Sequence, residues 1–389
     1  MGLKYKVLTD FTNGSGSYGI AASAVEKSES LPTYLRITDI YDDGTLNLDG
    51  LKSVDDPKSS NYFLQPNDIV FARTGGSTGR NYFYDGTDGE FVYAGFLIKF
   101  SIHPQKCNPK FIKYYCQSQE YKDWVQSFNT GSTRGNINAK TFGNMPIPDF
   151  SRTRQDLLVN SLSVIDDRIA ENKKINHHLA DVIDAQFGQL LENNELFEST
   201  FSELGEIVGG GTPSKKVEEY WNGDIPWLSP KDLSLNTALF TSKGQNSITE
   251  LGYKKSSAKM MPQNSILFSS RAPIGYITIA ENDISTNQGF KSIVPNPEYP
   301  YTFLYELLKQ ETPSLESSAS GSTFKEVSGT HLKQHIVEIP SITAIKDFHE
   351  SVEPLFQAIR LNEKEIQKLI ETRDILLPKL MTGEISVVS

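Results

Sequence analysis

The stretch Ser151–Phe187, SRTRQDLLVNSLSVIDDRIAENKKINHHLADVIDAQF, contains neither glycine nor proline. Its apolar residues recur every three or four positions, which is the spacing of one face of an α-helix. Thr153 followed by Asp156 is typical of a capping box at a helix start, and Gly188 is expected to end the helix. The stripe comprises Leu162, Ile165, Ile169, Asn172, Leu179 and Ile183, and Asn176 also interrupts it. The stretch therefore predicts one long amphipathic helix.

A second stretch of the same kind follows Pro340. Pro354 is expected to kink or restart this helix, and Pro378 to end it. Such stripes ordinarily belong to a helix packed on its own domain, but a narrow stripe of this length favours a coiled-coil pair. The second half of the predicted seam comprises Leu355, Ile359, Asn362, Ile366, Leu369 and Leu376.

Each helix closes one copy of an internal repeat with a period of about 190 to 197 residues. Letter by letter, Gly16 pairs with Gly211 and Gly95-Phe96 with Gly289-Phe290. The corresponding segments are YLRITDI (Tyr34–Ile40) with PWLSPKDL (Pro226–Leu233), PNDIVFART (Pro66–Thr74) with PQNSILFSSR (Pro262–Arg271), and GSTR (Gly131–Arg134) with GSTF (Gly321–Phe324). Few letters are identical, but the matching segments follow one another in the same order in both halves, which indicates a true repeat.

The order of repeats and helices predicts the fold class. The first helix leads from one globular unit to the next and the second leads back, so a helix pair must be antiparallel. Short strands such as DIVFA and FLIKF alternate with short helices, which is typical of α+β domains. We expect two globular α/β-mixed domains in a pseudo-twofold arrangement, joined by two long helices that form an antiparallel coiled coil. The expected ranges are 1–150 and 193–340 for the domains, 151–192 for the first helix, and 341–389 for the second helix and tail.

Composition indicates an ordinary globular protein. Of 389 residues, 38% are apolar and 22% are charged. No stretch approaches the roughly 18 apolar residues of a membrane span, and the first residues lack the apolar core of a signal peptide, so a cytoplasmic location is expected. Cys107 and Cys116 are too few for a disulfide framework, which fits that location.

The net charge of −10 by itself argues against a nucleic-acid partner. The two helical ranges together carry more of this excess than the two globular ranges, with five basic and nine acidic residues in 151–200 and six and eight in 341–389. The globular parts carry 15 basic and 16 acidic residues in 1–150, and 12 and 15 in 201–340. DNA binding by such a chain would leave much of the phosphate neutralisation to partner proteins.

Motifs of enzymes are present only in incomplete form. DFTNGSGSYG (Asp10–Gly19) contains G-x-G-x-x-G, as cofactor loops of methyltransferases do, but no amphipathic helix follows it. GGGTPSKK (Gly209–Lys216) lacks the end of a phosphate loop, and NPEY (Asn296–Tyr299) has glutamate where a methyltransferase motif has proline. His331 and His335 have the spacing of zinc ligands but no third ligand close in sequence. We therefore predict no active site, no cofactor and no metal.

The repeated loops instead carry groups that bind nucleic acid. Arginine and lysine read guanine, asparagine and glutamine read adenine, and hydroxyl groups hold phosphates. Any one of these residues is more easily explained as part of a turn, but their repetition at matching places favours a binding surface. The candidate DNA-binding residues are Arg73, Thr74, Ser77, Arg80, Asn81, Ser132, Thr133, Arg134, Asn136, Lys215, Lys231, Ser270, Arg271, Asn287, Gln288, Lys291, Ser322, Thr323 and Lys325.

GEIVGGGTPSKKVEEYWNGDIPWLSPKDL (Gly205–Leu233), NQGFK (Asn287–Lys291) and RDILLPKLMTGEI (Arg373–Ile385) resemble the DNA-specificity subunits of Type I restriction-modification systems. The resemblance covers the whole chain, although NGSGSYG replaces the GGTPS run in the first half. It implies two target-recognition domains, each reading one half of a bipartite, asymmetric double-stranded DNA target. It also implies that the helices act as a spacer and dock two methyltransferase (modification) subunits, that motor-nuclease (restriction) subunits join them, and that this chain is itself non-catalytic.

Two other functions remain open at this point. The chain could be a stand-alone two-headed DNA-binding protein, which co-purification with a methyltransferase subunit would distinguish. It could instead be a duplicated carbohydrate- or protein-binding module, since Tyr220, Trp221 and Trp227 could line a sugar cleft.

Overall fold

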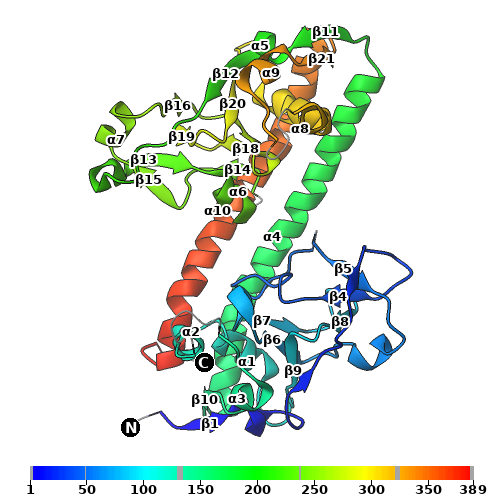
Figure 1. Cartoon of the computed structure of the whole chain (residues 1–389), viewed down its shortest axis with the longest axis vertical. Helices are drawn as coiled ribbons and strands as arrows, with labels where there is room; N and C mark the ends of the chain where they lie inside the picture. Colours follow the sequence, from blue (N-terminus) through cyan, green and yellow to red (C-terminus); the bar gives the residue numbers. More distant parts are fainter. Residues whose placement is uncertain (1–2, 49, 129–134, 236–237, 320–324, 386–389) are drawn as a thin grey trace. The chain divides into compact units, whose positions relative to one another are not determined.

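The computed structural model describes residues 3–48, 50–128, 135–235, 238–319 and 325–385. The chain divides into two compact units. Unit 1 is Met1–Asp167 with Leu369–Ser389, and unit 2 is Arg168–Lys368. Two long helices, α4 (Arg152–Glu192) and α10 (Ile342–Thr382), each contribute to both units (Figure 1).

In the described part of unit 1, the strands form two four-stranded sheets, β2-β9-β6-β7 and β3-β5-β4-β8, and a two-stranded ladder, β1-β10. The strands are β1 (Tyr5–Val7), β2 (Ser17–Tyr18), β3 (Ala24–Val25), β4 (Thr33–Leu35), β5 (Lys52–Val54), β6 (Asp68–Ala72), β7 (Asn81–Tyr84), β8 (Phe91–Tyr93), β9 (Leu97–Ser101) and β10 (Pro146–Pro148). The short helices are α1 (Pro109–Tyr115), α2 (Gln119–Gln126) and α3 (Ala139–Gly143), with 3₁₀ turns η1 (Leu8–Phe11), η2 (Ser59–Tyr62) and η3 (Gly75–Ser77).

In the described part of unit 2, the strands form a five-stranded sheet, β12-β20-β17-β18-β14, a four-stranded sheet, β15-β13-β19-β16, and a ladder, β11-β21. The strands are β11 (Phe197–Thr200), β12 (Gly205–Gly209), β13 (Trp221–Leu228), β14 (Phe240–Thr241), β15 (Asn246–Ile248), β16 (Met260–Met261), β17 (Ile266–Ser270), β18 (Ile274–Ala280), β19 (Ile284–Thr286), β20 (Lys291–Pro295) and β21 (Ile336–Ile339). The short helices are α5 (Phe201–Leu204), α6 (Pro230–Leu235), α7 (Glu250–Lys254), α8 (Tyr301–Ser318) and α9 (Gly329–Gln334), with the 3₁₀ turn η4 (Glu218–Tyr220).

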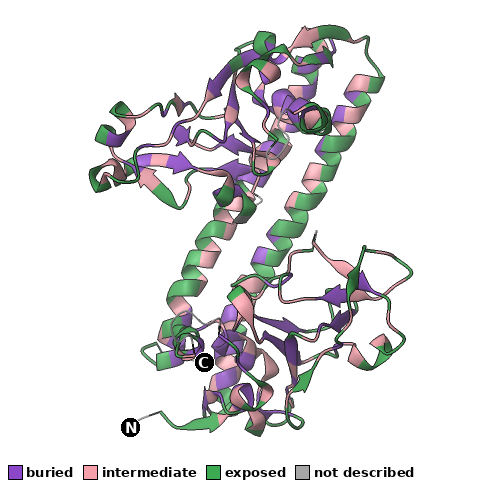
Figure 2. Ribbon diagram, viewed as in Figure 1, coloured by how far each residue is buried: buried purple, intermediate pink, exposed green. Residues whose placement is uncertain are grey.

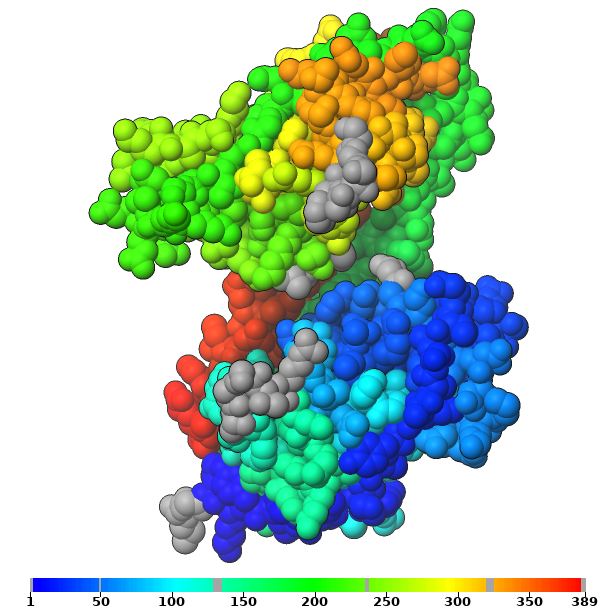
Figure 3. Space-filling model, in the orientation of Figure 1, coloured from blue at the N-terminus to red at the C-terminus, as the bar shows by residue number. Residues whose placement is uncertain are grey.

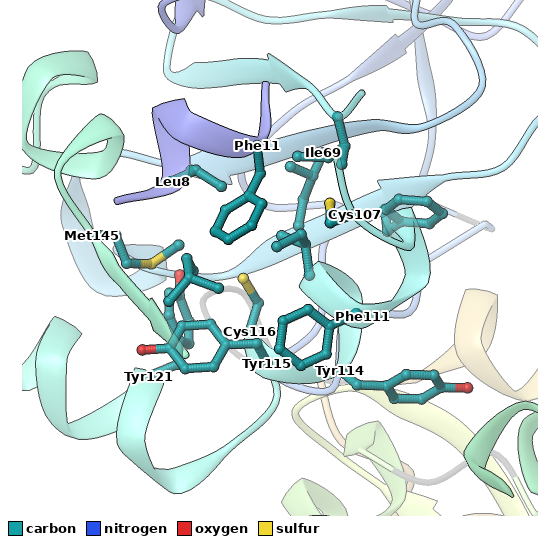
Figure 4. Close-up of a cluster of buried hydrophobic side chains, with 14 of the residues drawn as sticks. Leu8, Phe11, Ile69, Cys107, Phe111, Tyr114, Tyr115, Cys116, Tyr121 and Met145 are labelled. Atoms are coloured by element: carbon teal, nitrogen blue, oxygen red, sulfur yellow. The ribbon is translucent and has the colours of Figure 1, made fainter. Parts of the chain in front are cut away.

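The two units share one pairing scheme. The ladder β1-β10 corresponds to β11-β21, the antiparallel pair β6-β9 to β17-β20, and the parallel pair β4-β8 to β13-β19. The strands β6 and β17 are buried along their whole length, as the purple ribbon in Figure 2 shows. In unit 1, side chains from η1, β6 and α1, including Phe11, Ile69, Phe111 and Tyr115, pack into one apolar cluster (Figure 4).

The helices pair antiparallel within each unit. In unit 1, Leu158 and Leu162 near the start of α4 share a core with Leu377 and Leu380 near the end of α10. Figure 3 shows this red end of α10 lying beside the cyan surface of unit 1. In unit 2, the last turns of α4 share a core with the first turns of α10. The α+β fold class, with two globular domains and two long antiparallel helices, is therefore confirmed.

Every residue of the predicted seam is buried or half-buried. The apolar stripe is wider than the narrow seam expected, because it also packs on the domain cores. The asparagines within it form a polar layer in unit 2. Asn172 Nδ2 donates to Glu365 Oε2 at 2.9 Å, and Asn362 Nδ2 donates to Asn176 Oδ1 at 2.8 Å. These bonds fix which turns of the two helices face each other in unit 2, because a shift in register would leave buried amides unpaired.

The two predicted helix ends are wrong, and Pro354 does not restart the second helix; the predicted kink there stays a prediction. Gly188 lies inside α4, and Pro354 and Pro378 lie inside α10, which has no break between Ile342 and Thr382. A proline or glycine costs about 1–3 kcal/mol in a helix interior. Leu190 follows the glycine and Leu380 follows the second proline, and both are buried in the unit cores. Burial of about 1.5–3 kcal/mol per large apolar side chain is sufficient to carry the helix past each position.

A buried carboxyl in unit 2 makes its stability depend on pH. Burial raises the pKa of Glu306 on α8 from 4.5 to about 8, although nearby Lys309 lowers it in part. The proton-linked stabilisation is present below pH 4.5 and is lost as the pH rises through 8. Glu306→Gln is therefore expected to raise the free energy of unfolding above about pH 8 by roughly 2 kcal/mol, with little change at acid pH. Denaturant melts across this range check the result, with exposed Glu316→Gln on the same helix as control. Parallel pH profiles for the two variants would contradict it.

Candidate nucleic-acid interface

Two buried aromatic side chains occupy equivalent positions in the two units. Tyr34 Oη donates to the Ile20 carbonyl at 2.9 Å in unit 1, and Trp227 Nε1 donates to the Gly211 carbonyl at 2.9 Å in unit 2. Tyr34 and Trp227 lie on β4 and β13, which pair in parallel with β8 and β19. The internal repeat is therefore a repeat of backbone and hydrogen bonds as well as of letters.

The turn that follows each aromatic residue is also repeated. Asp39 Oδ2 accepts from the Arg36 amide at 2.8 Å, and Asp232 Oδ2 accepts from the Ser229 amide at 2.7 Å. The carboxylates play the same structural role, but the first residue of the turn is arginine in unit 1 and serine in unit 2. The frameworks are equivalent, and the polar groups that they hold differ.

The ends of β6 and β17 match through the same backbone hydrogen bonds. The bonds are Arg73 N to Phe96 O at 3.0 Å and Ile137 N to Arg73 O at 2.9 Å in unit 1, and Ser270 N to Gly289 O at 2.8 Å and Val327 N to Ser270 O at 3.0 Å in unit 2. Arg73 is therefore equivalent to Ser270, and the adjoining residues Thr74 and Asn136 are equivalent to Arg271 and Glu326.

Two pairings inferred from letters are wrong. The backbone hydrogen bonds show that the residue of unit 1 equivalent to Gly289 is Phe96, not Gly95. The Gly19 amide donates to the Leu97 carbonyl, and the Gly210 amide donates to the Phe290 carbonyl, so Gly19 is equivalent to Gly210. By the same alignment of strands, Gly16 is equivalent to a residue of β12 and not to Gly211. The segment that leads into β2 is longer than the one that leads into β12, and letter matching cannot detect such an insertion.

Unit 1 holds one arginine between two aromatic rings. The Arg73 guanidinium carbon lies 5.2 Å from the ring centre of Tyr18 and 5.8 Å from that of Phe96. Both rings are accessible, since Tyr18 is 42% and Phe96 is 55% exposed. Arg73 Nε is buried without a hydrogen-bond partner among the described residues. The rings hold the guanidinium in place by cation–π contact, and its other two nitrogens donate no hydrogen bond to a described residue.

The remaining predicted residues of unit 1 differ in availability. Arg80 Nε donates to Asp42 at 2.7 Å, so its charge is compensated. Asn81 is buried and donates to the Cys116 carbonyl at 3.1 Å, which makes it part of the fold and not of the surface. Thr74 and Ser77 are half-buried and Asn136 is exposed, and all three lie near Arg73 in the chain or by strand pairing.

Unit 2 contains a polar pocket of about 480 Å³ next to Trp227. Four predicted residues line it, Lys215, Lys231, Asn287 and Gln288. The other lining residues are Thr212, Trp221, Trp227, Ser229, Gln245 and Asn246. The sequence interpretation missed Gln245 and Asn246, because their segment has no counterpart among the repeated loops. They reach the pocket because β15 pairs with β13, with Asn246 opposite Trp227.

Internal hydrogen bonds orient the two amides that were predicted. Asn287 Oδ1 accepts from the Gly289 amide at 2.8 Å, and Gln288 Oε1 accepts from the Thr212 hydroxyl. Each side-chain oxygen is thereby engaged, and each NH₂ group remains able to donate. The pocket therefore presents amide donors together with two lysine ammonium groups, a set that suits base acceptors and phosphates.

The indole rings of this pocket serve the fold. Trp227 is only 4% exposed, and Trp221 Nε1 donates to the Ser214 carbonyl at 3.2 Å. The two rings meet edge to face with centroids 5.2 Å apart. Trp227 therefore offers no open face to a sugar ring, whereas half-buried Trp221 lines the pocket.

The last predicted residues lie beside the pocket or outside the described residues. Ser270 is buried and its hydroxyl donates to the Gly289 carbonyl at 3.0 Å, so it too belongs to the fold. Arg271 and Lys291 both lie near Glu326, and Lys325 is exposed. Ser132, Thr133, Arg134, Ser322 and Thr323 lie outside the described residues.

Motifs that suggested other chemistry have structural roles. A side-chain carbon on Gly210 would lie 2.0 Å from the Asn287 carbonyl, so the glycine run allows close backbone approach. His331 bonds to Ser318 and His335 to Glu311. Among the described residues, no group of three or more histidines, cysteines or carboxylates has the geometry to hold a metal ion. Over the same residues, the helices all fall short of the length and apolarity needed to cross a membrane.

These features define a class of protein with two equivalent α+β domains that carry different polar surfaces, and with two long antiparallel helices. Residues 33–180 and 194–372 match the family model for the Type I restriction modification DNA specificity domain. The chain belongs to this family.

Two curated relatives are similar to parts of the chain. The Type I restriction enzyme MjaIX specificity subunit of Methanocaldococcus jannaschii is 47% identical over 140 residues, which cover 36% of this chain and 32% of the relative. The Type I restriction enzyme HindI specificity subunit of Haemophilus influenzae is 34% identical over 188 residues, which cover 47% of this chain and 40% of the relative. Each match therefore spans less than half of the relative's length.

One solved structure resembles the chain over its length. The crystal structure of a Type-I restriction-modification system S subunit from M. genitalium aligns with a TM-score of 0.58 at 18% identity, covering 100% of this chain and 97% of the other. A similarity at this identity shows a shared fold.

Proposed function

We propose that this chain selects the DNA target of a Type I restriction-modification enzyme, and that each domain reads one half of a split, asymmetric site. The observation that carries the proposal is the repeated framework with different polar groups. Tyr34 and Trp227 make the same hydrogen bond, whereas Arg73 in one unit is Ser270 in the other. Two copies of one framework with different groups suit two different half-sites.

The groups in each unit suggest which bases they contact. Arg73 in unit 1 suits the O6 and N7 acceptors of guanine. The amides of Asn246, Asn287 and Gln288 in unit 2 suit adenine, and Lys215 and Lys231 suit phosphates. Asn81 and Ser270 are left out of this proposal because they are buried.

We further propose that the long helices dock two methyltransferase subunits and act as a spacer between the domains, with motor-nuclease subunits joining the complex. Three residues of α4, Val164, Ile175 and Val182, are 69%, 38% and 45% exposed. Their spacing in the sequence places them on one face of the helix. An exposed apolar stripe on a surface helix is typical of a protein interface.

The chain itself is proposed to carry no methylation, cleavage or ATP-hydrolysis activity and to need no cofactor. Its recognition domains are proposed to be 1–150 and 193–340, its helical parts 151–192 and 341–389, and its location the cytoplasm. The stand-alone two-headed DNA-binding protein is the alternative that co-purification tests.

The proposal is tested by expressing the full chain with its methyltransferase subunits and mapping the methylated bases in the host DNA. We expect a split motif that appears only when this chain is present, and co-purification of the two kinds of subunit. Methylation by the chain alone, or a motif that is independent of the chain, would contradict the proposal.

Arg73→Ala is expected to weaken binding to the mapped target by about 1–3 kcal/mol and to relax one position of the half-site read by unit 1. Removing a bidentate guanine contact should affect only the position that it reads. Methylation mapping and duplex binding check this. Arg80→Ala is the matched control, because the guanidinium of Arg80 is already paired with Asp42. An equal loss on all sequences would show that Arg73 contacts a phosphate instead.

A further inference from the structure

One carboxylate in unit 2 lies between two cations that the sequence predicts to contact DNA. Glu326 Oε2 is 3.5 Å from Arg271 Nη1, and Glu326 Oε1 is 3.5 Å from Lys291 Nζ. We refer to these three residues as the Glu326 triad. Its net charge is a single positive unit, although its two cations alone would carry two.

Contacts with the backbone hold the triad in place and connect it to a residue of the unit 2 pocket. The Val327 amide donates to Ser270 O at 3.0 Å, which holds Glu326 beside the residue that precedes Arg271. Lys291 Nζ donates to the Gln288 carbonyl at 3.3 Å, and Gln288 lines the pocket. The triad is therefore linked to the pocket through Gln288.

At the equivalent described positions of unit 1, the charged residues of this arrangement are absent. The residues equivalent to Arg271 and Glu326 are Thr74 and Asn136, which are uncharged. The position of Lys291 on β20 corresponds to Ile98 on β9, since Leu97 is equivalent to Phe290. The triad is therefore a feature of one domain and is not required by the shared framework.

The geometry of the triad makes the carboxylate replaceable. Charge-assisted hydrogen bonds are usually about 2.7–2.9 Å long, so two contacts of 3.5 Å are loose. Glu326 is 37% and Arg271 is 38% exposed, so water screens the pair. Such contacts contribute little to folding and can be exchanged for contacts with a ligand.

We propose that Glu326 is a specificity-determining residue that disfavours non-cognate DNA. This inference rests on the proposed function. When Arg271 and Lys291 bind phosphates on arbitrary DNA, Glu326 is left beside the phosphate anions without a donor. A cognate site supplies a donor, because the exocyclic amino group of cytosine or adenine donates a hydrogen bond to a carboxylate in the groove. The carboxylate therefore weakens non-specific binding more than specific binding.

The first arm of the test measures charge. Full-length wild type and Glu326→Gln are titrated with a duplex of scrambled sequence at several salt concentrations. The variant is expected to bind about tenfold more tightly at low salt, with a salt dependence steeper by about one unit of log slope, because a further cation becomes free to neutralise a phosphate. Glu298→Gln removes the same charge at an exposed position of unit 2 and serves as control.

The second arm measures base reading. Glu326→Ala, which removes the acceptor altogether, is expressed with the methyltransferase subunits, and the methylated motif is mapped. We expect one position of one half-site to relax, with the other half-site unchanged. A thermal melt of each variant confirms that it is folded.

The outcomes separate this inference from the proposed function. If the wild-type complex methylates no chain-dependent motif, the proposed function fails. If the wild type has a split motif, and neither the scrambled-duplex affinity nor any motif position changes in the Glu326 variants, the inference alone is overturned. An equal gain in affinity for Glu298→Gln would also overturn it, because the effect would then be one of net charge.

Discussion

Asp166→Ala is expected to lower the free energy of unfolding of unit 1 by about 3–5 kcal/mol. Asp166 on α4 accepts from Tyr114 Oη at 2.9 Å, from Lys113 Nζ at 3.1 Å and from Arg373 Nη1 at 3.2 Å. Its side chain is 16% exposed and that of Arg373 is 15% exposed. Loss of the carboxylate would leave Lys113 without this partner and Arg373 with only the more exposed Asp374, 3.4 Å from its Nε, and removing one partner is the costly way to break a buried ion pair.

The same site has a defined pH dependence. Burial alone would raise the pKa of Asp166, but Lys113, Tyr114 and Arg373 together outweigh burial and lower the pKa below its ordinary value of 3.8. A lowered pKa stabilises the folded state above pH 3.8, and that contribution is lost as the pH falls through the folded-state pKa. Wild type and variant should therefore converge in stability only in strong acid.

Denaturant unfolding measures the loss, and hydrogen exchange over Leu369–Thr382 localises it to the end of α10. Asp167→Ala is the matched control, since Asp167 is the exposed neighbour on the same helix. Small, equal losses in both variants would mean that the charges around Asp166 do not hold α10 to unit 1.

Exchange of the second domain for that of another family member is expected to change one half of the methylated motif and to leave the other half intact. Specific and non-specific binding of DNA typically differ by about 4–10 kcal/mol, so most discrimination at the old half-site should be lost. Methylation mapping measures the result. A simultaneous change in both halves would contradict the assignment of one half-site to each domain.

The structure determines where the exchange must begin. β11 pairs with β21, and β12 pairs with β20. If the exchange began at Gly209, the last residue of β12, β11 and β12 would come from this chain and their partner strands from the other family member. A replacement of 194–340 keeps these pairs together. Glu363 on α10 accepts from the backbone amides of Leu239 and Phe240, a contact that an inserted sequence without proline at these two positions can make. Two contacts depend on side chains, because Arg360 pairs with Glu281 and Asp184 pairs with Lys309. The inserted domain should therefore carry the same charges at positions 281 and 309.

The two helices and the duplication could be predicted because their signals are local or repeated. Apolar residues at helical spacing, as in Leu162, Ile165 and Ile169, require no knowledge of distant residues. The breaks at Gly188 and Pro378 were predicted wrongly because the energy that carries the helices past them comes from packing on the unit cores. The register of the repeat near Gly16 was wrong because strand pairing, not letter identity, sets the correspondence.

Sequence alone determined the α+β class, the two copies and the residue types that suit DNA, because periodicity, repetition and side-chain chemistry are properties of the chain itself. Tertiary structure decided which of those groups are available. It buried Asn81 and Ser270, held Arg73 between two rings, and brought Glu326 to Arg271 and Lys291 from segments far apart in the chain. The physical reason is that burial and charge compensation depend on neighbours in space, which strand pairing selects from distant parts of the sequence.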